Sequence, residues 1–308
     1  MKTIRYSVVL VCWVALCVVG QAVASDDEPN ALQRVLSSGA LTVAVYDDFP
    51  PYSYRDAKGR MVGIDVSVAK ALAERLGVGA VIRAVGADES MEDDLRNNVW
   101  KGHYLGGGVA DIMLHVPVDK AFAQENDRVV ILAPYFREQI VVATTQVLAG
   151  APLEAFDEQR VGVELDTMAD FFLLSARGGA MRNQVVHYRN MGEAVEALKR
   201  GELAGVAGPR AEVEFALGEQ RKDYVVQALP GLGRGGWDLG AAVKQGNDEL
   251  ASEIAAGMQR LRDGGVIERI FSQHHATYQA PDQDKPAAIA GDTDLAMTDA
   301  PEGSKRRP

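Results

Sequence analysis

Leu41-Thr42-Val43-Ala44-Val45 is the run of residues from which the fold class follows. Its β-branched side chains predict a short strand, and Pro50-Pro51 makes the segment after it a loop, because proline cannot donate to a sheet ladder. Val81 to Val85 predicts a second strand. A helix is expected between the two strands, so the stretch is a βα unit of a parallel sheet.

The helix of this unit is predicted from its periodicity. Apolar side chains recur at every fourth position, at Ile64, Val68, Leu72 and Leu76. This spacing places them on one face of an α-helix. Asp65 is the expected N-cap and Gly77 the expected stop.

The same alternation continues along the chain. Further strands are predicted at 110–116, 139–144, 160–164, 185–188, 205–208 and 237–243, and helices at 91–99, 169–176, 191–200, 211–217 and 249–262. Strands that alternate with helices indicate an α/β fold with mainly parallel sheets flanked by helices.

Length and composition fit a globular, two-domain protein. The chain has 308 residues, of which 47% are hydrophobic and 24% charged, and its formal charge is −11. This acidic balance argues against a nucleic-acid or anionic-membrane partner. Residues 280–308 alternate small and polar residues without apolar periodicity, and we expect them to form a disordered tail.

An export signal is predicted at the N-terminus, residues 1–24. Lys2 and Arg5 precede an apolar run, Val8 to Val19, and Ala22-Val23-Ala24 supplies the small residues that signal peptidase requires. The run is shorter than a membrane span. We therefore expect cleavage after Ala24, no membrane insertion of the mature chain, and a periplasmic location.

The reactive residue types are sparse. Both cysteines, Cys12 and Cys17, lie in the predicted signal, so a disulfide, a thiol nucleophile and a cysteine-ligated zinc are not expected in the mature chain. The five histidines lack the spacing of a metal site. No cofactor or metal is predicted.

Three segments together resemble bacterial extracytoplasmic solute-binding proteins of family 3, which have the periplasmic binding protein type II fold. They are Tyr46–Tyr54, Gly59–Val66 and Gly264–Phe271. The resemblance implies two lobes hinged by two crossover strands, near 136–141 and 231–237. Lobe 1 would comprise residues 31–137 and 233–278, and lobe 2 residues 138–232. Such a fold captures a small molecule between its lobes and presents the closed form to an ABC-type permease.

The chain departs from the family at its ligand-binding motifs. The family's amino-acid binders clamp the ligand carboxylate with an Arg, where Lys120 stands here, and receive the ligand ammonium group with an Asp, where Pro209-Arg210 stands. Lys120, Arg210 and the helix N-terminus at Thr167 favour an anionic or polar ligand. Each of the two basic residues is equally well read as a surface charge.

Other candidate ligand contacts have structural alternatives. Tyr52 and Tyr54 follow the diproline, where the family stacks an aromatic ring on its ligand; the alternative is a cover for the sheet edge. Asp47 contacts the ligand or stabilises the turn. His115 contacts the ligand or is a satisfied core histidine. Trp237, at the second crossover, is expected in the core rather than the cleft.

The Gly-rich segment Trp100–Gly108 resembles a subgroup of this family that is associated with quinoprotein dehydrogenases. That resemblance implies a role in pyrroloquinoline-quinone-dependent alcohol oxidation, and docking on the dehydrogenase or a cytochrome c is the first alternative to solute binding. A dehydratase of prephenate-like acids is the second alternative, because some exported relatives catalyse that reaction. We predict a non-catalytic binding protein.

Overall fold

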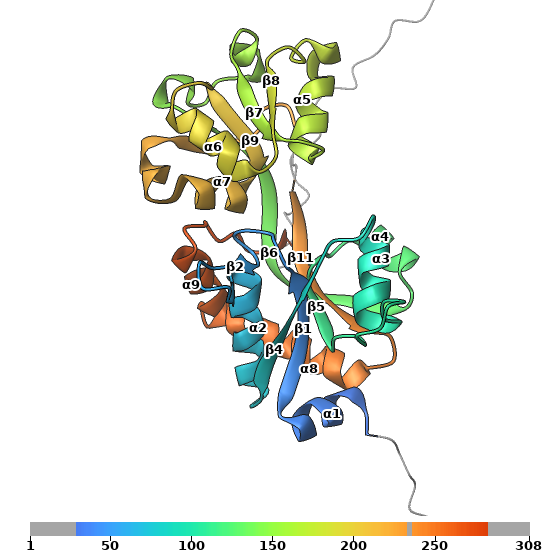
Figure 1. Ribbon diagram of the computed structural model, residues 1–308. Coiled ribbons are helices and arrows are strands. Elements are labelled where there is room, and N and C mark those ends of the chain that lie inside the picture. Colours follow the sequence, from blue (N-terminus) through green and yellow to red (C-terminus); the bar gives the residue numbers. More distant parts are fainter. Residues whose placement is uncertain (1–28, 233–235, 283–308) are drawn as a thin grey trace, which may run out of the picture.

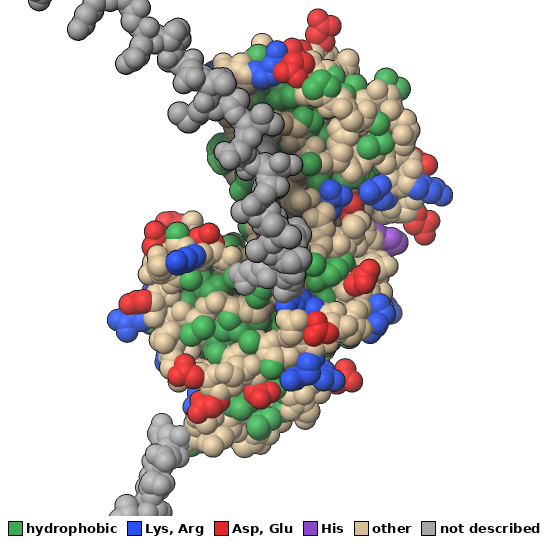
Figure 2. Space-filling model, turned by 180° about the vertical axis from the view of Figure 1, so that it is seen from behind, with side chains coloured by type: hydrophobic (Ala, Val, Ile, Leu, Met, Phe, Trp, Pro, Cys, Tyr) green, Lys and Arg blue, Asp and Glu red, His purple; other side chains and the backbone are tan. Residues whose placement is uncertain are grey.

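The chain folds into two α/β lobes stacked end to end (Figure 1). The computed structural model describes residues 29–232 and 236–282. The predicted signal peptide and nearly all of the predicted tail lie outside these residues. Within the described residues, no helix is both long and apolar enough to cross a membrane. Seen from behind, acidic and basic side chains are interspersed over the visible surface of both lobes (Figure 2).

Lobe 1 is built on a mixed sheet. The strand order is β4 (Gly79–Val85), β1 (Ala40–Tyr46), β5 (Ile112–Pro117), β11 (Gly236–Lys244) and the first part of β6 (Val129–Thr144). The first three strands are parallel, and β11 runs antiparallel to both of its neighbours. A small antiparallel pair, β2 (Tyr54–Arg55) and β3 (Met61–Val62), lies beside this sheet. The predicted βα unit over residues 41–85 is present.

Helices cover both faces of the lobe 1 sheet. On one face lie α1 (Ala31–Ser38), α2 (Ile64–Arg75), α8 (Asp248–Asp263) and α9 (Val266–Gln273), which share a core with Val43 and Val45 of β1. The other face packs Ala44 of β1 against α3 (Met91–Leu95) and the π-helical turn Arg96–Trp100. The short helix α4 (Lys120–Glu125) lies on this side too (Figure 1). Successive residues of β1 therefore serve two cores.

Lobe 2 repeats the architecture at smaller size. Strands β8 (Val185–Tyr188), β7 (Val161–Glu164) and β9 (Gly205–Pro209) are parallel, and β9 pairs antiparallel with the second part of β6. Strand β10 (Val225–Ala228) pairs with β6 on its other side. Helix α5 (Met168–Gly179) packs on one face of the sheet, and α6 (Met191–Lys199) and α7 (Arg210–Leu217) pack on the other. Short 3-10 turns occupy Gln146–Leu148, Leu153–Phe156 and Gly218–Asp223.

One strand connects the lobes through its whole length. β6 is 16 residues long and pairs with β11 in lobe 1 and with β9 and β10 in lobe 2. The sequence predicted only its second half, residues 139–144, as a strand. The second crossover includes residues 233–235, outside the described residues, but Trp237 beside them packs against the cores of both lobes.

The N-cap predicted for the helix of the first unit is wrong. The N-cap of α2 is Gly63, with φ of 126°, and Asp65 lies inside the first turn with 0% of its surface exposed. A side chain at residue 63 would collide with the Tyr52 carbonyl, 2.3 Å from the Cβ position. Asp65 is thus available for a tertiary role. The helix predicted at 91–99 ends in the π-helical turn.

Candidate functional site

The strand ends of both lobes face each other across a cleft. The pairing register places the carboxyl ends of β1 and β5 at the hinge side of lobe 1, and those of β7 and β9 at the hinge side of lobe 2. Loops and helix N-termini follow these ends. In open α/β sheets, ligands bind outside the carboxyl ends of the strands.

A pocket of about 480 Å³ spans the two lobes, and we call it the inter-lobe pocket. Lobe 1 contributes Asp48, Phe49 and Pro50 from the loop after β1. Lobe 2 contributes the end of β7, the start of α6 and one side of α7, with the side chains of Glu164, Arg189, Asn190, Met191, Glu212, Phe215 and Ala216. Its volume is that of a small-molecule site.

The electrostatics of the inter-lobe pocket are acidic. Glu212 on α7 is only 9% exposed, and among the described residues no hydrogen bond or ion pair reaches its carboxyl group. Burial raises the pKa of Glu212 well above its ordinary value, and the charges of Glu164 and Glu138 raise it further. Burial also raises the pKa of Glu164. Such carboxyls lack a cationic partner.

The basic residue at the edge of this pocket does not neutralise it. The side chain of Arg189 is 87% exposed and forms an ion pair with Glu193, one turn into α6. The inter-lobe pocket therefore has three carboxyl groups, those of Asp48, Glu164 and Glu212, against one outward-facing guanidinium.

A second pocket, of about 520 Å³, lies in lobe 1 and is called here the lobe-1 pocket. Its walls are mostly apolar and aromatic: Tyr46, Phe49, Val85, Met91, Pro117, Trp237 and Leu239. The charged residues of its lining are Asp47 and Asp48, and His115 also lines it. Asp48 and Phe49 line both pockets, so the two cavities meet at these residues.

A β-bulge aims His115 into its position. Val116 pairs with Gly240 and Leu114 with Ala241, which leaves His115 as an extra residue of β5, with φ of 64°. A bulge of this kind redirects a side chain that would otherwise follow the alternation of the strand. His115 is 9% exposed, and its ring lies edge-on to Phe49 and Tyr52, with centroid distances of 4.9 and 4.2 Å.

Asp65 fixes the orientation of the His115 ring. His115 Nδ1 lies 3.2 Å from Asp65 Oδ2, and the hydroxyl of Tyr135 donates to Asp65 Oδ1 at 2.7 Å. Because a carboxylate only accepts, the Nδ1–H of His115 donates to Asp65, and Nε2 takes no part in this hydrogen bond. The residue predicted as a helix cap thus positions a pocket residue.

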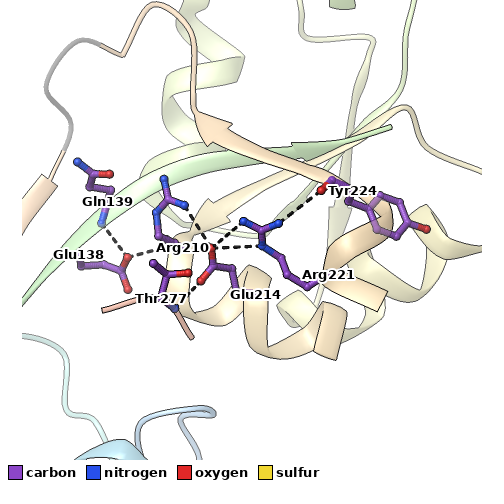
Figure 3. Close-up of polar contacts among 7 residues, drawn as sticks. All are labelled: Glu138, Gln139, Arg210, Glu214, Arg221, Tyr224 and Thr277. Atoms are coloured by element: carbon purple, nitrogen blue, oxygen red, sulfur yellow. Dashed lines mark hydrogen bonds and ion pairs between the residues drawn. The ribbon is translucent and has the colours of Figure 1, made fainter. Parts of the chain in front are cut away.

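A polar cluster at the hinge joins the lobes, and we call it the hinge cluster (Figure 3). Glu138 on β6 accepts hydrogen bonds from the backbone N–H groups of Gln139 at 2.7 Å and Arg210 at 2.9 Å, and from the hydroxyl of Tyr52. Glu214 on α7 pairs with the Arg210 guanidinium at 3.2 Å. Arg221 and the backbone N–H of Thr277 complete the cluster, because both also reach the Glu214 carboxylate.

The structure places Arg210 in the hinge cluster, and its predicted contact with an anionic ligand stays a prediction. Its guanidinium is bound to Glu214, which is 0% exposed, and Arg210 is absent from the linings of both pockets. The Arg210 guanidinium therefore already has a buried carboxylate partner, which it shares with Arg221. Lys120 is exposed at the first turn of α4 and likewise lines neither pocket.

The remaining predicted contacts divide between pocket walls and supports. Tyr52 is 1% exposed, so in this conformation it supports the hinge instead of contacting a ligand. The Tyr54 ring lies against Phe215 of lobe 2, with a centroid distance of 5.6 Å and an interplanar angle of 56°. Asp47 lines the lobe-1 pocket and pairs with Arg55 at 2.8 Å. The Thr167 side chain caps α5 by accepting from Asp170 N.

The sequence reasoning missed Phe49 and Glu212. Phe49 lies in the segment Tyr46–Tyr54, but the contacts predicted in that segment were Asp47, Tyr52 and Tyr54. Glu212 has a signal in the sequence: it lies in the otherwise apolar segment Ala211–Leu217 together with Glu214. Residues two apart lie on different faces of a helix. Glu212 and Glu214 are therefore not expected to share the same partners. Within the described residues, no cluster of potential metal ligands is present.

Comparisons with known proteins agree with this geometry. Residues 41–100 match the model of the bacterial extracellular solute-binding proteins, family 3. The L-cystine-binding protein TcyJ of Escherichia coli is 23% identical over 258 residues, which are 82% of this chain and 89% of that protein. The arginine-binding protein ArtJ of Chlamydia trachomatis, a probable ABC transporter component, is 24% identical over 75% of this chain and 84% of its own length.

A shorter match has higher identity. The cyclohexadienyl dehydratase of Pseudomonas aeruginosa is 39% identical over 66 residues, which are 21% of this chain and 25% of the enzyme. The chain therefore matches about a quarter of that relative's length.

Solved structures share the whole two-lobe architecture. An ancestral cationic amino acid solute-binding protein superimposes with a TM-score of 0.65 at 18% identity, covering 79% of this chain and 99% of that one. A polar amino acid uptake binding protein of Streptococcus thermophilus gives 0.65 at 18% identity, over 82% and 92%. The chain has the type II periplasmic binding protein fold, and its residues 41–100 are similar to the extracellular solute-binding proteins of family 3.

Proposed function

We propose that this protein binds an extracytoplasmic solute that carries a cationic nitrogen, in the inter-lobe pocket. One observation carries the proposal: the buried Glu212 carboxyl has no partner among the described residues and lines a pocket with Glu164 and Asp48. An ammonium or guanidinium group supplies the missing partner. Burial of an unpaired carboxylate is costly, so its neutralisation favours the bound state.

This ligand class differs from the anionic one that the sequence suggested. A carboxylate in the inter-lobe pocket would meet three acidic side chains, and the cations of Arg210 and Arg189 are held by Glu214 and Glu193. Like charges at close range disfavour binding by several kcal/mol. The relatives named for arginine and for cationic amino acids are consistent with the reversed sign.

Closure of the lobes on the solute would allow a partner protein to distinguish the loaded from the empty form. Each lobe supplies part of the pocket, so the ligand stabilises the closed form over the open one. A permease that recognises the closed form then receives loaded protein. We propose an ABC-type permease as the partner, in line with the transporter relatives, and the periplasm as the location.

Calorimetry with the purified protein tests the charge of the ligand. The panel contains agmatine and L-arginine, which carry a guanidinium group, and L-glutamate as an acidic ligand. We expect a cation to bind and the Glu212→Gln variant to weaken it by about tenfold to a hundredfold, the range for a hydrogen bond to a charged group. Glu219→Gln, which changes an exposed acid in the 3-10 turn directly after α7, is the matched control. Tighter binding of L-glutamate than of every cation contradicts the proposal.

Dehydratase activity is a second candidate because of the 39% identical match. A carboxyl with a raised pKa, such as Glu212 or Glu164, is suited to act as a general acid. The acidic pocket, however, is a poor receptor for a substrate with two carboxylates, so we propose binding without turnover. Turnover of prephenate by the wild-type protein and its loss in Glu212→Gln would establish the enzyme instead.

Docking on a quinoprotein dehydrogenase or a cytochrome c stays a prediction. The loop that suggested it exposes Tyr104 and Leu105, at 87% and 77% of their surface. Exposed apolar side chains of this kind are typical of contact sites. Capture of a purified dehydrogenase by the wild type but not by Tyr104→Ser would support this role.

A further inference from the structure

We infer that the solute also has an apolar, ring-bearing body, which occupies the lobe-1 pocket while its cationic nitrogen reaches the acids of the inter-lobe pocket. This inference rests on the proposed function and specifies the ligand class as arylalkylamines. The observation behind it is the lobe-1 pocket of about 520 Å³, which a ligand confined to the inter-lobe pocket would leave empty.

The lining of the lobe-1 pocket disfavours anionic ligand groups. Among residues 29–232 and 236–282, no Lys or Arg lines it, whereas the acids Asp47 and Asp48 do. A ligand carboxylate placed there would meet acidic side chains and no basic side chain of the described lining. Asp47 is already paired with Arg55, which leaves Asp48 as the acid facing both pockets.

The same lining favours a flat apolar group. Tyr46 and Phe49 stand edge to face with centroids 6.0 Å apart, and Trp237 lines the pocket from β11 of the same sheet. Aromatic walls and the thioether of Met91 offer stacking and sulfur contacts. His115 also lines the pocket and adds one polar ring to the apolar wall. Pockets with a few placed polar groups in an apolar wall are typical ligand sites.

The two pockets are positioned to share one molecule. Asp48 and Phe49 line both of them, so a ligand body stacked in the lobe-1 pocket directs its side arm past Phe49 toward Glu164 and Glu212. An aromatic ring joined to an amine by two or three carbons has this form. A cation without a ring fills only the acidic half.

Lobe 2 carries apolar side chains at the matching end. Leu165, Met168 and Phe171 follow the carboxyl end of β7, which faces the cleft, and they are 53%, 49% and 60% exposed. Leu165 precedes α5, and Met168 and Phe171 lie in its first turn; in Figure 1, α5 lies above α3 and α4 on the same side of the molecule. Closure over an apolar ligand body would give these side chains a partner, and closure over a small cation would not.

The test compares tryptamine with agmatine and indole-3-acetate by calorimetry. We expect tryptamine to bind about tenfold to a hundredfold more tightly than agmatine, as burial of an aromatic group predicts. Indole-3-acetate, with the same ring and a negative charge, is expected to bind at least tenfold more weakly than tryptamine. Tryptamine binding no tighter than agmatine overturns the inference and leaves the proposed function in place. Equal binding of both indoles, or no binding of any cation, overturns the proposed function as well.

A pocket-filling variant separates the two cavities. Gly86 lines the lobe-1 pocket, and no atom lies within 4 Å of a Cβ built on it, so Gly86→Trp enters open space. We expect this variant to weaken tryptamine at least tenfold and to leave agmatine within about threefold. Val81→Trp, on the exposed side of β4, is the control, and Ala87→Phe is a second filling variant with a smaller ring. An equal loss of both ligands in the filling variants contradicts the two-pocket arrangement.

Discussion

Two acidic regions lie on either side of helix α7, and they differ in how their carboxyls are satisfied. In the hinge cluster, Glu214 is 0% exposed and bonds to Arg210, Arg221 and the Thr277 N–H. In the inter-lobe pocket, Glu212 is nearly as buried and no bond reaches it from the described residues. The first arrangement stabilises the fold, whereas the second leaves a favourable interaction for a ligand to make.

Glu214 and Glu212, two residues apart on α7, thus have different roles: the first is structural and the second is proposed to bind the ligand. Both side chains are buried glutamates in the same short helix, so burial and residue type do not distinguish them. Their partners do. Removal of a satisfied carboxylate leaves two guanidinium groups uncompensated, but removal of an unsatisfied one relieves a cost. Substitutions at the two positions should therefore change stability in opposite directions.

The largest effect is expected from Glu214→Gln. The amide keeps the size of the side chain but removes the charge that holds Arg210, Arg221 and the segment at Thr277. Loss of a buried ionic partner costs about 3 kcal/mol. Chemical denaturation of the variant beside Glu219→Gln measures the difference. A loss no greater than that of the control variant would mean that the hinge cluster contributes nothing to stability.

Tyr52→Phe is expected to have the next largest effect. The ring packing of Tyr52 against His115 and Phe49 remains, but Glu138 loses the hydroxyl that donates to it. Glu138 is fully buried and its pKa is already raised by burial, so the lost donor should destabilise the protein by about 1.5 kcal/mol. Tyr54→Phe, on the more exposed neighbour, should change stability by less than about 0.5 kcal/mol in the same denaturation experiment.

Glu212→Gln should stabilise the ligand-free protein, with a dependence on pH. Because folding raises the pKa of Glu212, the wild type loses stability as the pH rises through that folded pKa, and glutamine does not titrate. At neutral pH the variant should be more stable by about 1 kcal/mol. The advantage should shrink as the pH falls from the folded pKa of Glu212 toward the ordinary pKa of glutamate, because below the ordinary value the carboxyl is protonated in both states. Melting curves from about pH 4 to pH 8 test this, and a constant difference would contradict it.

The same raised pKa predicts a proton balance on binding. A cation stabilises the ionised forms of Glu212 and Glu164, so a bound cation lowers their pKa values and releases protons. Cation affinity should therefore rise with pH. Calorimetry in two buffers of different ionisation enthalpy counts the released protons, and in Glu212→Gln the count should fall to the contribution of Glu164.

The fold was predictable because it depends on local patterns. The strands at 41–45 and 81–85 and the periodic helix between them each carry their own signal, and the structure contains all three. The ends of elements depended on tertiary contacts: Gly63 caps α2 because the Tyr52 carbonyl leaves no room for a side chain. Asp65 looked like a cap because its type favours caps, but His115 and Tyr135 use its carboxylate.

The site was less predictable because its charge depends on partners distant in sequence. Arg210 suggests an anion site until Glu214 and Glu138 are seen to occupy its side chain and its backbone N–H. Glu212 suggests nothing until Glu164, from another strand, lies beside it in one pocket. The bulge that turns His115 inward likewise comes from its register with β11 and not from its own sequence.

The smallest effect is expected from Lys120→Ala, although the sequence made Lys120 a ligand contact. The residue is exposed at the start of α4, outside the linings of both pockets. Removal of an exposed charge should change stability by less than about 0.5 kcal/mol and leave cation affinity within about twofold. The measurement is a calorimetric titration with the best cation of the panel. A tenfold loss of affinity would place Lys120 at the closed site and would return the anion to consideration, because a cationic side chain that aids binding requires a negative group on the ligand.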